Sequence, residues 1–293
     1  MDLGLSPLIK VGKGRIDFKV NATYNDNVVL TTLNNTPVVI GGSTNFISFS
    51  SGSPTANNIA VVGQPAFAFQ LTDYNRDPQG HVIVDATTGL PSKANNSVIT
   101  GRTLPLWIVG LTPSYSIGNF AVSMTWEYKG GNDFYSGLGS DMDFAGISAR
   151  SVEYGRKPFV FPNSVYWDGS KYVPNTKILV QDGNYGFWAT NVNTQIATNY
   201  YASAAAWRLR ELNISYTLPS KWLGGNKIFK RVTVSALGKN LFLFVPKSNQ
   251  WGDPEFNFIN PLAPASAQNT AGLGTAYQTP AGRFFGGSLT VQF

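Results

Sequence analysis

The sequence of 293 residues contains no cysteine and a single histidine, His81. Without cysteine, a disulfide-stapled fold and metal sites built on thiolates are excluded, and one histidine cannot form a metal-binding cluster. Charged residues are also scarce: they make up 13% of the chain, about half of the roughly 25% typical of soluble domains. A disordered chain of high net charge and a coiled coil are therefore excluded as well.

Long apolar runs are missing too. No stretch reaches the roughly 18 apolar residues of a transmembrane helix, and residues 1–4 lack the basic and apolar regions of a signal peptide. We therefore expect either a cytosolic chain or the downstream part of something longer. The formal charge is +6, but the lysines and arginines are scattered, so we expect no nucleic-acid partner.

Aromatic residues, in contrast, are abundant at 13%, and apolar side chains recur at every second position. A period of two predicts strands with one apolar and one polar face. The alternating segments are 16–24, 107–117, 120–128, 207–218, 232–243 and 288–293. Gly118-Asn119 predicts a tight hairpin. A shift of the alternation between Leu209 and Leu212 predicts a bulge, and Lys239-Asn240 should mark a bulge or the point where the strand leaves the sheet.

The connections between these strands differ sharply in length. Residues 27–103, 131–206 and 245–282 are long and polar, whereas the other turns are short, with one helical turn expected at 220–223. Outer-membrane barrels have short turns on one side and long extracellular loops on the other. The pattern predicts an all-β, antiparallel transmembrane β-barrel portion of about seven strands, or about nine if residues 27–103 add a pair. A soluble β-sandwich is the alternative with the same alternation.

Several blocks of the sequence resemble a known family. They are residues 62–65, 80–85, 104–111, 118–120, 130–133, 207–219, 238–242, 253–255 and 279–293. Among them are Trp-Arg-Leu-Arg-Glu-Leu at 207–212 and Asp-Pro-Glu at 253–255. Together and in this order, they resemble the SusC/RagA family of TonB-dependent outer-membrane transporters of Bacteroidota.

The resemblance implies that residues 1–293 are the C-terminal portion of a barrel of about 22 strands, with the plug domain and TonB box absent from this chain. The implied location is the cell outer membrane. The implied function is non-enzymatic import of oligosaccharides or peptides, without a cofactor. The implied partners are a SusD-like lipoprotein, the TonB complex through the missing N-terminal region, the barrel-assembly machinery and outer-membrane lipid.

Two other functions fit the residues without the resemblance. One is a soluble β-rich glycan-binding module, whose apolar strand faces would pack against each other rather than against lipid. The other is a passive porin-like channel. A plug and a TonB box upstream of residue 1 would distinguish an active transporter from such a channel.

Aromatic residues supply two sets of candidate functional residues. Those between the strands suit sugar rings or peptides in a water-filled vestibule: Trp167, Tyr172, Tyr185, Trp188, Tyr200 and Trp251. The alternative is that these rings pack the loops against each other or onto a partner lid. A second set is expected to lie at the membrane interface: Trp107, Trp126, Tyr128 and Trp222.

The polar residues offer weaker candidates. Asp73, Asn75 and Asp77 resemble the start of a calcium loop, but Pro78 stands where the turn glycine belongs, so an Asx turn is favoured. The acidic residues near position 141 lie in a loop where nothing fixes the separation that glycosidases require, and we predict no enzyme.

The last strand offers a candidate assembly signal. Its alternating apolar residues end on an aromatic one: Leu289, Val291 and Phe293. The resemblance implies that these three residues are recognised by the barrel-assembly machinery.

Overall fold

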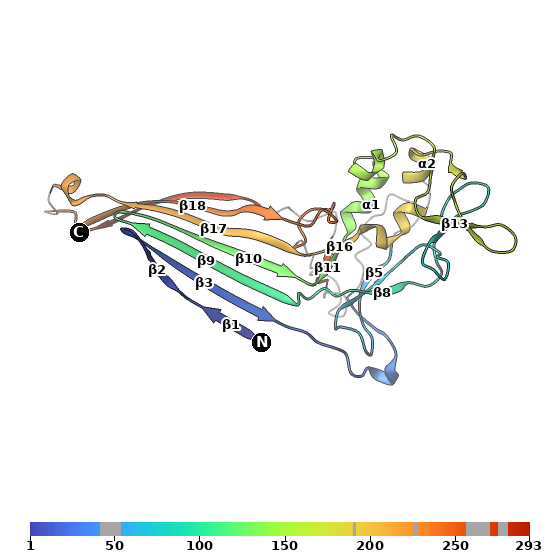
Figure 1. The fold of residues 1–293 in the computed structure, drawn as a ribbon, viewed down its shortest axis with the longest axis horizontal. Helices are drawn as coiled ribbons and strands as arrows, with labels where there is room; N and C mark the ends of the chain where they lie inside the picture. The colour runs from blue at the N-terminus through green and yellow to red at the C-terminus, as the bar shows by residue number, and fades with distance from the viewer. Residues whose placement is uncertain (42–53, 190–191, 225–227, 256–269, 275–280) are drawn as a thin grey trace.

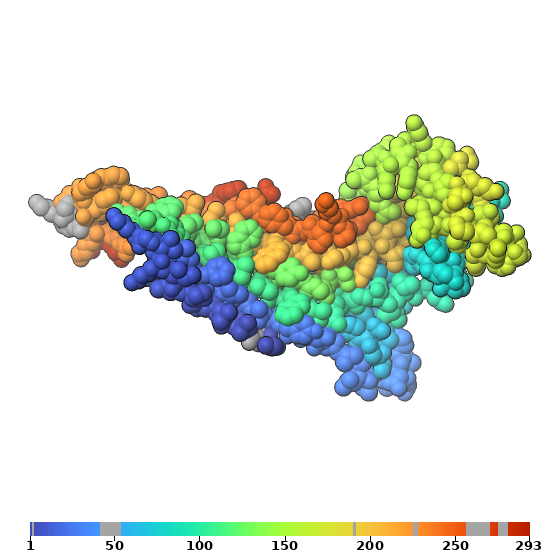
Figure 2. All heavy atoms as spheres, viewed as in Figure 1, coloured from blue at the N-terminus to red at the C-terminus, as the bar shows by residue number. Residues whose placement is uncertain are grey.

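A computed structural model describes residues 1–41, 54–189, 192–224, 228–255, 270–274 and 281–293. The molecule has two parts: one long sheet, and a globular mass at one end of it (Figure 1; Figure 2). All three long connections meet in that mass. We call the described residues of 25–106, 131–205 and 245–283 the loop head.

The long sheet is antiparallel throughout and runs in the order β1-β3-β9-β10-β17-β18-β20, with β2 also paired to β3. Its strands are β1 (Asp2–Leu5), β2 (Leu8–Val11), β3 (Gly14–Tyr24), β9 (Trp107–Ile117), β10 (Phe120–Gly130), β17 (Ala206–Thr217), β18 (Arg231–Phe244) and β20 (Phe284–Gln292). Because β1 and β2 lie end to end along β3, the sheet is seven positions wide, as the alternation predicted. Among the described residues, the sheet is open: neither β20 nor the β1–β2 edge has a further partner strand.

Both predicted irregularities are bulges within the sheet. Arg210 is skipped in the pairing of β17 with β18 and with β10, since Leu209 and Glu211 pair with consecutive partners on β10. On β18, Asn240 adopts the left-handed conformation with φ 52°. The strand nevertheless continues to Phe244, so the alternative that it leaves the sheet at this point is wrong.

The register separates the two faces of the sheet by polarity. Apolar residues stand opposite one another across neighbouring strands, for example Val20 with Leu111 and Val234 with Leu289. Many of these side chains are exposed; Leu289 is 65% exposed and Val234 48%. The other face carries serine, threonine, asparagine and charged side chains. Such a sheet has no protein layer over its apolar face among the described residues.

The loop head contains the buried core of the molecule. Its strands are β4 (Val38–Gly41), β5 (Ala56–Ala60), β6 (Ala68–Leu71), β7 (Val82–Ile83), β8 (Val98–Thr100), β11 (Asp133–Ser136), β12 (Phe159–Val160), β13 (Ser164–Trp167), β14 (Tyr172–Pro174), β15 (Leu179–Val180), β16 (Tyr201–Ser203) and β19 (Leu273–Gly274). The helices are α1 (Gly137–Phe144) and α2 (Tyr185–Trp188), with 3-10 turns η1 (Leu33–Asn35), η2 (Ala149–Val152), η3 (Val192–Gln195) and η4 (Ala197–Tyr200). Outside the loop head, η5 (Ser220–Leu223) confirms the predicted helical turn.

The three long loops fold together rather than separately. One cluster of buried residues joins the first loop, through Tyr74 and Val84, to Phe159 and Trp188 of the second. Another joins Phe69 to elements of the second and third loops, and β7–β13 and β11–β19 pair in parallel between loops. The described residues of 27–103 contribute a separate sheet, β4-β5-β6-β8, and the strand β7, which pairs with β13, so the expectation that they add a pair to the long sheet is wrong.

No helix among the described residues is long and apolar enough to cross a membrane.

Candidate functional site

The polar face of the long sheet carries a group of alternating charges where it meets the loop head. We call it the ion cluster: Glu127, Lys129, Arg208, Arg210, Asp253 and Glu255. Arg208 is almost fully buried and donates hydrogen bonds to both carboxylate oxygens of Asp253, one of them at 2.7 Å. Such a bidentate pair fixes direction as well as distance. The cluster therefore holds the loop that follows β18 against the strands.

Glu255 is the centre of this cluster. It accepts from Arg210 and from Lys129 (2.7 Å), and Arg208 lies 3.4 Å away. Burial alone would raise the pKa of the Glu255 carboxyl, but these donors and the surrounding positive charge lower that pKa to about 2. Glu255 is therefore ionised at any physiological pH. It stays paired with Lys129 on β10 and with Arg208 and Arg210 on β17.

The same loop reaches the core of the loop head through Trp251. The Arg150 guanidinium lies over three rings, those of Trp188, Tyr200 and Trp251, at 5.5, 5.9 and 5.8 Å from their centroids. Its Nε is 3.8 Å from the fully buried Asp143. Arg150 thus joins all three rings and a buried carboxylate into one packed unit.

The structure separates the six candidate substrate-binding aromatics into two groups. Trp188 and Tyr200 are buried in this Arg150 unit, and Trp251 packs on Tyr200 with ring centroids 5.3 Å apart. In this conformation Trp188 and Tyr200 pack the loops together, the alternative that the sequence left open.

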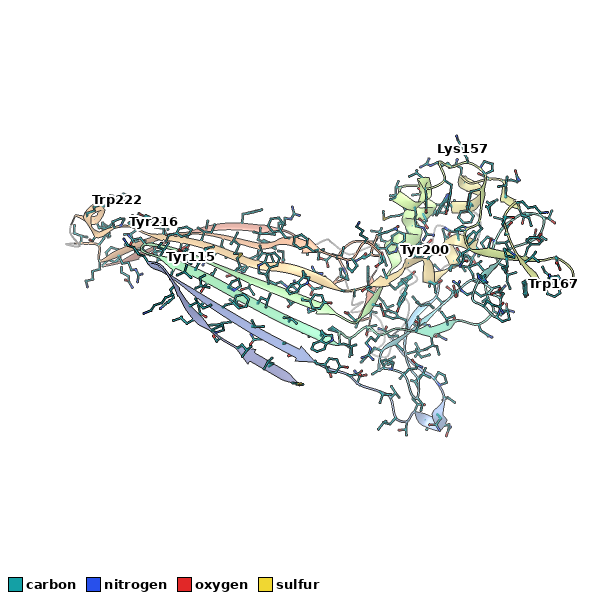
Figure 3. All side chains as sticks on the ribbon, viewed as in Figure 1. Tyr115, Lys157, Trp167, Tyr200, Tyr216 and Trp222 are labelled. Atoms are coloured by element: carbon teal, nitrogen blue, oxygen red, sulfur yellow. The ribbon has the colours of Figure 1, made fainter. Side chains whose placement is uncertain are left out.

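The other three rings are exposed. Trp167 and Tyr172 stand side by side at the tip of the β13–β14 hairpin, at 50% and 39% exposure, with Trp167 at the extreme of the loop head (Figure 3). Tyr185 is 62% exposed. These three are placed where a ligand outside the loop head could meet them.

The predicted interface aromatics lie at the two ends of the long strands. Trp107, Trp126 and Tyr128 are at the end near the loop head, where Trp107 packs on Tyr24 (4.7 Å) and Tyr128 on Trp207 (5.0 Å). Trp222, 63% exposed, lies at the opposite end, near Tyr216 and Tyr115 (Figure 3). The strands between carry about 11 residues, the length of a transmembrane strand.

The candidate calcium loop has its acids turned to protein partners. Asp73 accepts from Arg76 (2.7 Å) and from Thr198 (2.7 Å), and these bonds lower its pKa against the opposing effect of burial. Asp77 accepts from the backbone of Gln79 and from both the backbone and the ring of His81. Its bond to Gln79 is the favoured Asx turn. Among the described residues, no three His, Cys, Asp or Glu side chains are grouped so that they could hold a metal ion.

The candidate assembly strand, β20, pairs along its whole length with β18 and forms an edge of the sheet. Leu289 and Val291 lie on the apolar face, opposite Val234 and Val232. Phe293 packs on Phe229 at 5.6 Å and is 73% exposed. The three residues thus line one face of an open edge.

Sequence patterns alone did not identify the residues that organise the loop head. Asp141 and Asp143 lie in α1, so the expectation that the acidic residues near position 141 lie in a loop is wrong. Asp143 pairs with Arg150 and accepts from Ser148 (2.5 Å). Arg150 carried no recognisable motif. The ion cluster had a partial signal in the sequence, because Arg208 and Arg210 alternate with apolar residues and acidic residues follow at Asp253 and Glu255.

The chain is similar in fold to chains of three solved structures named as the RagAB peptide transporter, the RagAB peptide importer in the closed-closed state and the same importer in the open-open state. The TM-scores are 0.58, 0.57 and 0.58 at 14%, 15% and 13% sequence identity. Each match covers 100% of this chain and 29%, 29% and 28% of the other.

The likeness is therefore one of fold, and this chain spans less than a third of the length of those transporter chains. No family model matches the sequence, and no curated protein matches it. The structural neighbours are transporters rather than enzymes.

Proposed function

We propose that the long sheet is the C-terminal part of the barrel wall of a SusC/RagA-like TonB-dependent importer in the outer membrane. The observation that carries the proposal is the continuous, exposed apolar face of a sheet whose other face is polar, bounded by aromatics at both strand ends. Lipid is the environment that such a face requires. The fold likeness to the RagAB chains over the whole length of this chain supports the same function.

The loop head forms the extracellular vestibule in this proposal. The substrate of the importer is an oligosaccharide or a peptide. A peptide is favoured, because the similar structure is a peptide transporter. Trp167, Tyr172 and Tyr185 are the ligand contacts we propose, because they remain exposed in the folded loop head. A SusD-like lipoprotein covers the vestibule, and TonB acts on the plug domain of the complete importer.

Assembly of the barrel depends on its last strand. Leu289, Val291 and Phe293 form the signal that the barrel-assembly machinery binds, and β20 then pairs with the first strand of the complete barrel. The exposure of these side chains on an edge strand supports this role.

The proposal is tested by fractionation of cells that express the chain together with its upstream region. The protein should float with outer membranes in a density gradient and should require detergent for extraction. Recovery as a soluble periplasmic protein would refute the proposal and would favour a soluble glycan-binding module. An upstream sequence without a plug and a TonB box would leave a passive channel.

A further inference from the structure

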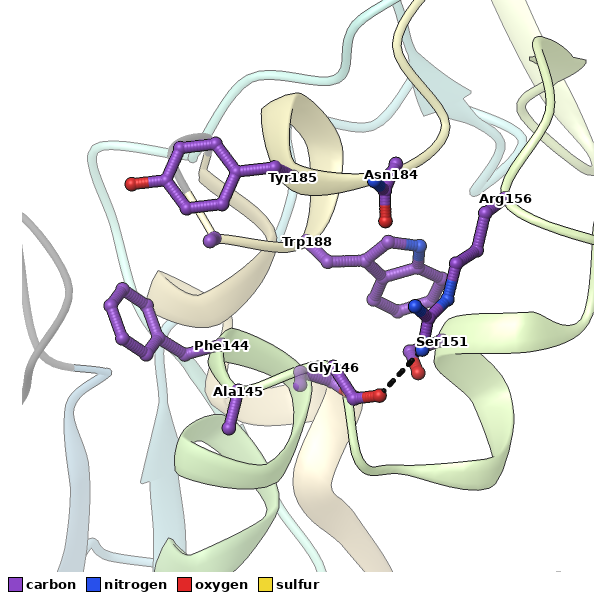
Figure 4. A pocket seen from close by; sticks show the side chains of 10 residues that line it. Phe144, Ala145, Gly146, Ser151, Arg156, Asn184, Tyr185 and Trp188 are labelled. Carbon is purple, nitrogen blue, oxygen red and sulfur yellow. Dashed lines mark hydrogen bonds between the residues drawn. The ribbon is translucent and has the colours of Figure 1, made fainter.

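A small pocket opens on the loop head between the end of α1, η2 and α2 (Figure 4). Its volume is about 170 Å³, and it is lined by Asp143, Phe144, Ala145, Gly146, Ser151, Arg156, Asn184, Tyr185, Trp188 and Ala189. At about 30 Å³ for each water, this is the space of roughly six waters. Pockets for drug-sized ligands start at about 300 Å³. The pocket therefore fits one end group of a ligand, not an extended oligomer.

The rim of the pocket carries a positive charge, that of Arg156, which forms no ion pair with an acidic residue of the loop head. Arg156 is exposed, and one of its Nη atoms donates to the Gly146 carbonyl at 2.8 Å (Figure 4). Arg156 forms no ion pair with any described residue. A guanidinium has five N–H donors, of which a single carbonyl uses one. Arg156 can therefore bind a carboxylate from outside the chain.

Asp143 is the only acidic residue in the pocket lining, and its carboxylate oxygens already have partners within the loop head. Its oxygens accept from Ser148 (2.5 Å), from Tyr200 (3.0 Å) and from Asn193 (3.2 Å), and Arg150 lies at 3.8 Å. The side chain is fully buried. It therefore offers an incoming anion little repulsion compared with an unpaired carboxylate.

The walls of the pocket are formed before any ligand arrives. Trp188 is fixed by its Nε1 donating to the Gly183 carbonyl (3.2 Å) and by the Arg150 cation over its ring. Gly183 lies so close to the Lys157 carbonyl that an added Cβ would overlap it. A preformed pocket binds with less loss of conformational entropy than one that must be ordered.

We propose that this pocket binds the carboxylate end group of the imported oligomer. The carboxylate pairs with Arg156 and accepts from the Asn184 amide, and the adjoining carbon skeleton packs on the exposed Tyr185. The origin of the ligand rests on the proposed import function. The same chemistry is supplied by the C-terminus of a peptide and by a terminal uronic acid, which the experiment distinguishes.

The experiment is calorimetric titration of the complete outer-membrane protein in detergent. The probes are N-acetyl-Ala-Leu, its C-terminal amide, glucuronic acid and glucose. One acid should bind at least tenfold more tightly than its neutral counterpart, and the pair that shows this identifies the source. Arg156→Gln should weaken binding of that acid about tenfold, and Arg156→Lys less. Tyr185→Ser, at an exposed position, should weaken the acid and its neutral counterpart alike.

Lys171→Gln is the matched control, since it removes one positive charge from the loop head outside the pocket lining. It should leave every affinity unchanged. Equal affinity for acid and neutral probes, no binding of either acid, or an unchanged affinity in Arg156→Gln would overturn the proposal. An uptake assay on the same cells separates the two proposals. If the cells take up the ligand but Arg156→Gln does not change the binding of the acid, only the pocket proposal is refuted. If the acid binds through Arg156 but the cells do not take it up, only the import function is refuted.

Discussion

Glu255 is the residue that connects the loop after β18 to two neighbouring strands of the sheet. Glu255→Gln removes the charge that Lys129, Arg208 and Arg210 share. An exposed ion pair contributes about 0–1 kcal/mol, and breaking a buried one costs about 3–5 kcal/mol. For this half-buried carboxylate we expect about 2 kcal/mol, which is about a 30-fold rise in local opening. Hydrogen exchange of the backbone at 249–255 measures it.

The same substitution has a pH dependence with a fixed sign. The pKa of Glu255 is lowered from 4.5 to about 2, so its stabilisation is complete above pH 4.5 and is lost as the pH falls toward 2. The difference in exchange between Glu255→Gln and the unmodified protein should shrink over that range. Glu211→Gln is the control, because Glu211 is 45% exposed and its single ion-pair partner among the described residues, Lys239, lies as far away as 3.9 Å. An equal effect of both substitutions at pH 7 would contradict the central role of Glu255.

At the scale of the element, β20 permits a direct comparison of the two faces of the sheet. Leu289 lies on the apolar face opposite Val234, and the adjacent Ser288 lies on the polar face opposite Ser235. An arginine on a lipid-facing position costs about 2–4 kcal/mol near the bilayer midplane. Leu289→Arg should therefore lower the amount of folded barrel in the outer membrane, whereas Ser288→Arg should be tolerated. Heat-dependent gel mobility measures the folded fraction, and equal tolerance of the two would contradict the assignment of the faces.

The long strands could be predicted from sequence, and the loop head could not. In β3, β9 and β10 the alternation is local, so the 11 residues of each strand carry the whole signal. The strands of the loop head are two to five residues long, and two of their pairings, β7–β13 and β11–β19, join different loops. A pairing between segments far apart in sequence leaves no periodic pattern in either one.

The candidate site divides in the same way. The exposure of Trp167 and Tyr172 follows from a short hairpin of aromatic and polar residues, which sequence can indicate. The burial of Trp188 and Tyr200 depends on Arg150 and Asp143, which approach them only after the second loop has folded. Residue type alone therefore does not distinguish a packing aromatic from a ligand-binding one.

At the scale of the whole molecule, the buried core and the proposed membrane surface are in different places. The described core residues lie almost entirely in the loop head, while the long sheet has two open edges and an exposed apolar face. Unpaired edge groups and apolar surface of this kind associate with other chains in water and cannot persist unpaired in lipid. The edges of the sheet, open among the described residues, therefore need further partner strands.

We accordingly expect residues 1–293, expressed alone and purified without detergent, to aggregate. Because the loop head has its own core, its backbone amides should still exchange more slowly in the aggregate than the amides at the open edges of the sheet. Light scattering and calorimetry test the expectation on one sample. A monodisperse monomer with a discrete cooperative transition would contradict it, since such a chain must cover its apolar face with protein. Co-expression with the upstream region supplies the control, because the completed barrel should then be recovered folded in detergent.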